Sequence, residues 1–180
     1  VDKAKNDDVY AKERRIYELS QIDGMPPCIA YQIPFRHLCN LLQINAGDTA
    51  AVMKLLPDIK PEQRERFETR ARCAWFWITE CAPEEFRFTL RTDDAKPALT
   101  ETETAAIQKI RDELLPQMEK MDEKAFSTAL YDVAHACGIE PKALFTAVYQ
   151  ALIGKEQGPR LAGFMKIIGH ERLAQLLISY

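Results

Sequence analysis

The sequence predicts an all-α protein, a multi-helix bundle of about eight helices. Apolar residues recur at spacings of three and four along most of the chain, which is the period of a helix with one buried face. Pro34, Pro61 and Pro141 each stand directly before or at the start of such a pattern, where proline suits the first helical turn. All seven glycines except Gly163 lie at or near the expected helix boundaries. No stretch has the pattern of a β-hairpin or of a strand–helix–strand unit.

Four helices are expected in the first half of the chain. They begin at Asp7 or Asp8, at Pro34, after Gly47 and Asp48, and at Pro61, and the last runs to about Cys81. The segment "CIAYQIP" before the second helix is expected to be extended, because a residue before proline avoids the helical conformation. In the last helix Phe67, Ala71, Ala74 and Ile78 follow one another at spacings of four, three and four, so they predict a buried stripe.

A polar stretch, "TDDAKPA" at 92–98, is the expected linker between two helical subdomains, residues 1–92 and residues 98–180. Thr100 and Glu103 have the spacing of a capping box for the next helix, and Pro116 is expected to kink that helix. The remaining helices are expected at 122–137, from Pro141 to Gly154, from Gly158 and Pro159 with Arg160 in the first turn, and after Gly169.

Composition indicates a globular protein: 47% of the 180 residues are hydrophobic and 28% are charged. There is no apolar run of the length that spans a membrane, and the first residues have no signal-peptide pattern. Five cysteines without a CxxC pair predict no metal site and favour a reducing, cytoplasmic compartment. The net charge of −3 is unlike that of a protein that coats nucleic acid non-specifically.

The charge is unevenly distributed. Residues 60–72 hold five basic side chains against three acidic ones, whereas residues 93–123 hold nine acidic against four basic. An acidic protein with this distribution can still present one basic face. The sequence has no P-loop, no glycine-rich loop after a strand and no HExxH, so we expect no catalytic residue and no cofactor in this chain. A helical protein-interaction module and a small enzyme with an enclosed site are the alternatives to a binding domain for nucleic acid.

Two sets of residues are candidates for RNA binding on the helix from Pro61. Arg66 and Arg70 lie four residues apart on one face, where like charges repel unless an anion such as a phosphate lies between them. Trp75 and Trp77 point about 200° apart, so one can be buried while the other is exposed and stacks on an unpaired base. The alternative interpretation is a solvated helix face with mixed ion pairs.

A third candidate site is the stretch "ALIGKEQGPRLAGF" at 151–164. Lys155 and Arg160 flank a turn that leads into a helix, whose first N–H groups carry the positive end of the dipole. A phosphate would be stabilised there, and the alternative is a tight turn with two surface cations. Arg36 and His37 in "PFRHL" are further candidates for contacts with RNA bases.

The segments "YQIPFRHLCNLLQIN" at 31–45 and "LYDVAHACGIEPKALFTAVYQALIGKEQGPRLAGFMKIIGHERL" at 130–173 resemble the C-terminal region of class I lysyl-tRNA synthetases. The order "LIGKEQGPR" then "IIGHERL" is also similar to the end of glutamyl-tRNA synthetases, which is the alternative family. The resemblance covers most of the chain but not residues 83–100.

This resemblance implies a helix-cage domain that binds the anticodon arm of lysine tRNA, with residues 1–92 on the connecting, stem-contact side. The parent enzyme would be a class I lysine–tRNA ligase that uses ATP and magnesium. Its N-terminal catalytic domain, with HIGH-like and KMSKS-like motifs, would be a partner within the same chain, because neither motif is present here.

Overall fold

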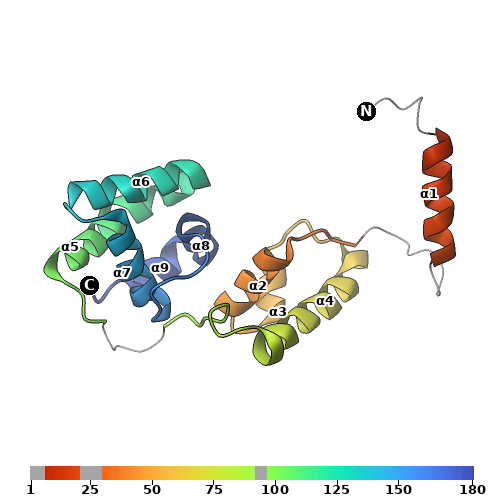
Figure 1. The fold of residues 1–180 in the computed structure, drawn as a ribbon, viewed down its shortest axis with the longest axis horizontal. Helices are drawn as coiled ribbons and strands as arrows, with labels where there is room; N and C mark the ends of the chain where they lie inside the picture. Colours follow the sequence, from red (N-terminus) through yellow and green to blue (C-terminus); the bar gives the residue numbers. More distant parts are fainter. Residues whose placement is uncertain (1–6, 21–29, 92–96) are drawn as a thin grey trace.

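The computed structural model describes residues 7–20, 30–91 and 97–180 (Figure 1). All regular secondary structure in these ranges is helical, which confirms the all-α prediction. The α-helices are α1 (Asp7–Ser20), α2 (Phe35–Ile44), α3 (Thr49–Lys54), α4 (Arg64–Phe76), α5 (Glu101–Lys109), α6 (Glu123–Ala136), α7 (Pro141–Ile153), α8 (Leu161–Ile168) and α9 (His170–Leu176). Short 3-10 segments (Pro61–Gln63 and Leu115–Lys120) and π-helical turns (Trp77–Cys81 and Ile110–Leu114) adjoin α4 and α5.

At three of the expected helix starts, those at Asp48, Thr100 and Asp122, a side chain caps backbone N–H groups. Asp48 and Asp122 each accept a hydrogen bond from the backbone N–H three residues later, at 2.9 and 2.7 Å. Thr100 and Glu103 form the expected capping box, in which each side chain accepts from the other residue's backbone N–H. Around Pro116 the helical path changes to a 3-10 segment, because proline cannot donate the α-helical hydrogen bond.

The start of α8 differs from the prediction. The sequence predicts that Gly158 and Pro159 open this helix, with Arg160 in its first turn. In the structure the helix begins at Leu161, and Arg160 is the N-cap residue with a non-helical ψ of 117°. The carbonyl of Pro159 accepts a hydrogen bond from the hydroxyl of Tyr149, and this bond ties the loop to α7 ahead of the first helical turn.

Buried apolar side chains form two clusters. The first core lies among α2, α3, α4 and the π-helical turn that follows, and it includes Leu38, Leu42 and Phe67. The second core lies among α5 to α9 and includes Phe126 and Phe164. Figure 1 shows these two groups of helices side by side, with α8 on the side of the second group that faces α2. α2 contacts α8, and residues from the start of both helices line one pocket, which is described below.

The chain between the two groups contributes to both. Phe88 and Leu90 precede the expected linker, yet their side chains lie in the second core, where Phe88 contacts Phe164 edge to face. The backbone N–H of Arg91 donates to the carbonyl of Leu152 at 2.8 Å. Residues 92–96 of the expected linker lie outside the described residues, and the division into residues 1–92 and 98–180 stays a prediction.

Among the described helices, none has both the length and the apolar character required to cross a bilayer.

Candidate nucleic-acid interface

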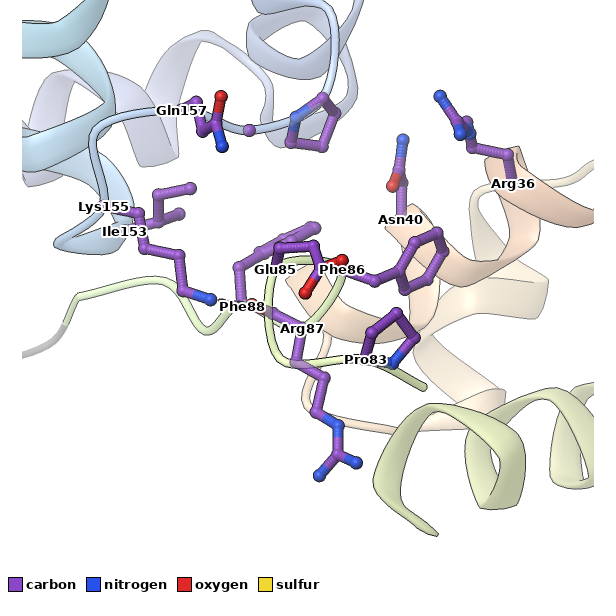
Figure 2. A pocket seen from close by; sticks show the side chains of 12 residues that line it. Arg36, Asn40, Pro83, Glu85, Phe86, Arg87, Phe88, Ile153, Lys155 and Gln157 are labelled. Carbon is purple, nitrogen blue, oxygen red and sulfur yellow. Dashed lines mark hydrogen bonds between the residues drawn. The ribbon is translucent and has the colours of Figure 1, made fainter. Parts of the chain in front are cut away.

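The loop between α7 and α8 is attached to the segment that precedes the linker. The ammonium of Lys155 donates hydrogen bonds to the carbonyls of Glu84 and Arg87, at 2.7 and 2.6 Å. Figure 2 shows this side chain reaching from the loop down to the turn that carries both carbonyls. Because an ammonium has three N–H donors, one donor remains for another acceptor. Lys155 therefore holds the loop in place, whether or not it also contacts a phosphate.

A cavity of about 320 Å³ lies beside this lysine, and we name it the loop cavity (Figure 2). Its walls come from α2, from the segment 83–88 and from the loop 153–159. The lining residues are Arg36, Asn40, Pro83, Glu85, Phe86, Arg87, Phe88, Ile153, Lys155, Gln157, Gly158 and Pro159. The loop cavity thus brings the predicted residues Arg36 and Lys155 to one opening.

A second, more open pocket of about 590 Å³ lies where α2 and α8 begin, and we name it the interhelical pocket. Its lining residues are Pro34, Arg36, His37, Asn40, Glu123, Pro159, Arg160, Gly163, Phe164, Lys166 and Ile167. Arg36, His37 and Arg160 were all predicted from the sequence as RNA-binding residues, and they come from segments more than 120 residues apart. The fold therefore gathers predicted contacts from both halves of the chain.

The interhelical pocket is positively charged for two reasons. Neither α2 nor α8 has an acidic residue in its first turn, and neither N-cap side chain accepts a hydrogen bond. The positive ends of both helix dipoles therefore face the pocket without a charge from their own helix to offset them. The pocket is also lined by three basic side chains, Arg36, Arg160 and Lys166, against one carboxylate.

These cations differ in how freely they can move. Arg36 and Arg160 are exposed and make no hydrogen bond or ion pair with any described residue. Lys166 is half-buried, and its ammonium donates to the carbonyl of Met121. The two arginines are therefore the side chains that can turn toward a bound anion.

The single carboxylate, that of Glu123 at the start of α6, lies close to the first turn of α8. A Cβ placed on Gly163 would come within 3.0 Å of its Oε1, so the absence of a side chain at Gly163 permits this approach. Glu123 partly offsets the positive end of α8. It also shows that this end of the helix can accommodate a negatively charged oxygen.

The two arginines predicted on α4 lie elsewhere. Arg66 is exposed and makes no hydrogen bond with a described residue. Arg70 is half-buried and donates to the carbonyls of Tyr31 and Ile33, at 3.4 and 2.7 Å, so it holds the extended segment before α2. Among the described cavities, those that contain Lys155 or Arg160 are lined by neither arginine. Their roles in RNA binding stay predictions.

Both predicted tryptophans are half-buried and packed against other residues. The ring of Trp75 covers Gly47, where a Cβ would lie 2.5 Å from the indole. Trp77 contacts Phe35 and Phe86 edge to face, with ring centroids 5.2 and 5.0 Å apart. The exposed aromatic ring of this helix is instead that of Phe76, between them, at 63% exposure. Stacking of either tryptophan on a base stays a prediction.

Asn40 and Lys166 are polar residues of the interhelical pocket that were not predicted. Asn40 follows Arg36 by four residues, so it lies on the same face of α2, and this spacing could have identified it. Lys166 lies in the last turn of α8 and reaches the pocket only because α8 packs against α2 and α6. No local pattern in the sequence indicates that packing.

Comparisons with known proteins identify the family. The profile of the anticodon binding domain family matches residues 38–176. Over 178 residues the chain is 52% identical to the lysine–tRNA ligase of Treponema pallidum (strain Nichols), covering 98% of this chain and 34% of the relative. It is also 36% identical to the lysine–tRNA ligase of Borreliella burgdorferi, covering 93% of this chain and 32% of the relative. The identity to the lysine–tRNA ligase of Thermococcus kodakarensis is 29%, over 95% of this chain and 34% of the relative.

These matches confirm the resemblance to lysyl-tRNA synthetases that the segments 31–45 and 130–173 indicated. The chain spans about a third of the length of the curated relatives that it matches. Because the family profile covers most of the chain, from the middle of α2 to the end of α9, the chain belongs to the anticodon binding domain family.

Proposed function

We propose that this chain binds the anticodon arm of lysine tRNA, and that the interhelical pocket holds the RNA backbone. The observation that carries the proposal is the convergence of Arg36 and Arg160, both unpaired within the described residues, at two helix N-termini. Phosphate oxygens are suited to this arrangement, because they accept hydrogen bonds from guanidinium and backbone N–H groups and carry the charge that both dipoles favour. Membership in the anticodon binding domain family supports RNA as the source of the phosphate.

The same proposal extends to the whole protein, which we infer to be a cytoplasmic class I lysine–tRNA ligase of which this chain forms a C-terminal part. The curated relatives support this inference, because each is a lysine–tRNA ligase about three times as long as the matched region. Lysine activation with ATP and magnesium would then take place in the N-terminal catalytic part. Large apolar side chains on α1 are exposed, including Val9, Ile16 and Leu19, and they support a contact between α1 and that part.

Binding of the 180-residue chain to anticodon stem-loops tests the proposal. We expect fluorescence anisotropy to give tighter binding to the lysine stem-loop than to a glutamate stem-loop and to a loop of scrambled sequence. Equal affinity for all three at 150 mM salt would contradict the lysine assignment. A preference for the glutamate loop would support the alternative family indicated by the end of the sequence.

Variants at Arg36 and Arg160 test the site. Arg36→Ala and Arg160→Ala should each weaken binding, and each should reduce the slope of log affinity against log salt by about 1 if it removes one phosphate contact. Arg172→Ala, at an exposed arginine of α9 that lines none of the described cavities, is the matched control and should change neither quantity. If Arg172→Ala weakened binding as much as Arg36→Ala, the effect would be one of general charge and the interhelical pocket would not be the site.

A further inference from the structure

A third cavity, of about 640 Å³, lies between α6, the middle of α7 and the start of α8, and we name it the α6 groove. It shares Arg160 and Glu123 with the interhelical pocket, so the two cavities adjoin at the start of α8. Of the predicted RNA-binding residues, only Arg160 lines this groove.

The wall of the α6 groove includes an aromatic pair. Tyr131 of α6 is 44% exposed, although α6 packs on the second core through Phe126 and Leu130. Its ring meets that of Phe145 on α7 edge to face, with centroids 5.1 Å apart and planes at 72°. This contact fixes the tyrosine ring against α7 while a large part of the ring stays accessible. A fixed, accessible aromatic ring is the surface on which unpaired bases stack.

Two polar groups of the groove, the hydroxyl of Ser127 and the guanidinium of Arg160, can contact the base and the phosphate of one nucleotide. The hydroxyl of Ser127, one turn before Tyr131 on α6, makes no hydrogen bond with any described residue. It can therefore donate to, or accept from, a base edge. Thr128 is different, because its hydroxyl already donates to the carbonyl of Lys124 at 3.1 Å. Arg160 stands where the groove meets the interhelical pocket, so a phosphate held there would have its own base beside the groove.

We propose that the α6 groove receives one unpaired base of the bound RNA, which stacks on Tyr131 while Arg160 holds the adjoining phosphate. The proposal rests on the proposed function, because it takes the ligand of the interhelical pocket to be RNA. An apolar side chain of a protein partner is the other occupant that an aromatic groove accommodates. RNA is favoured here because the groove continues into a pocket lined by cations and helix N-termini rather than into a further apolar surface.

Tyrosine variants of the 180-residue chain test this proposal by affinity and salt dependence together. Tyr131→Ala should weaken binding of the lysine stem-loop roughly 5- to 150-fold, which is the range for loss of one stacked base. The salt slope should stay at the wild-type value, because no phosphate contact is removed. Tyr131→Trp should bind within about threefold of wild type, since indole also stacks on bases. Phe76→Ala, at an exposed aromatic residue outside the groove, is the matched control and should bind like wild type.

A set of stem-loops that each lack one base identifies the nucleotide. At one loop position, removal of the base should weaken binding to the wild-type chain. The same removal should not change binding to Tyr131→Ala, because that variant already lacks the stacking contact. If the wild-type chain bound the stem-loop and Tyr131→Ala bound it equally tightly, the groove assignment would be wrong and the proposed function would still hold. If the wild-type chain bound no stem-loop at all, both proposals would be wrong.

Discussion

Gln43 of α2 accepts a hydrogen bond from the backbone N–H of Phe88 at 2.7 Å, across 45 residues of sequence. The glutamine is 3% exposed and is the single buried polar side chain among the described residues. Its own Nε2 has no hydrogen-bond partner within the same part of the structure. The bond connects a helix of the first core to a non-helical segment whose phenylalanine belongs to the second core.

Replacement of this glutamine should destabilise the protein. In Gln43→Leu the N–H of Phe88 loses its acceptor in a buried place, which costs about 1–3 kcal/mol. Loss of the unpartnered Nε2 offsets part of that cost, so we expect urea unfolding to give a free energy lower by about 1 kcal/mol. Gln108→Leu, at an exposed position of α5, is the control, and equal stability of the two variants would show that the Gln43 bond contributes nothing.

Lys155 should contribute more to stability than Arg160 does, although both are cations of the same loop. Lys155→Met removes two hydrogen bonds from an ammonium to carbonyls, and we expect the free energy of unfolding to fall by about 1–3 kcal/mol. Arg160→Ala should change it by less than about 0.5 kcal/mol, because that side chain makes no hydrogen bond with a described residue. Thermal unfolding of both variants checks this contrast, with Lys142→Met at an exposed lysine of α7 as the control.

Gly47 should tolerate alanine less well than Gly138 does. Both have positive φ, 82° and 67°, so alanine at either position is strained by about 1–2 kcal/mol. At Gly138 a Cβ would meet no atom within 4 Å, whereas at Gly47 it would lie 2.5 Å from the ring of Trp75. Gly47→Ala should therefore cost at least about 1 kcal/mol more than Gly138→Ala in urea unfolding. Equal losses would mean that the indole moves aside freely.

Alkaline pH should lower the free energy of unfolding, and part of this decrease should come from Tyr149. Burial raises the pKa of its phenol from the ordinary value of 10.0 to about 12. Below pH 10 the phenol is neutral in both folded and unfolded chains. Between pH 10 and about 12 the unfolded chain loses this proton first, so the unfolding free energy falls by about 2–3 kcal/mol from this group. In Tyr149→Phe that part of the decline should be absent. Unfolding curves at pH 9 and pH 12 would measure the difference, with Tyr17→Phe at an exposed tyrosine as the control.

Much of the fold could be predicted because the helices carry their own signals. Asp48, Thr100 and Asp122 cap helices through contacts within four residues, so the sequence alone identifies them. The start of α8 could not be placed correctly, because the hydrogen bond that holds Pro159 comes from Tyr149 on another helix.

The site also depends on contacts between segments that are distant in the sequence. Arg36 and Arg160 could be named as cations near helix starts, but their meeting at one pocket depends on the packing of α2 against α8.

The interhelical pocket has one wall from each core, α2 from the first and α8 from the second. A ligand that contacts both walls binds only while the two cores remain docked, and it therefore stabilises that docked arrangement by mass action. Bound RNA would thus hold the two cores together. The protein should melt as one cooperative unit in the complex, and loss of either half should release the RNA.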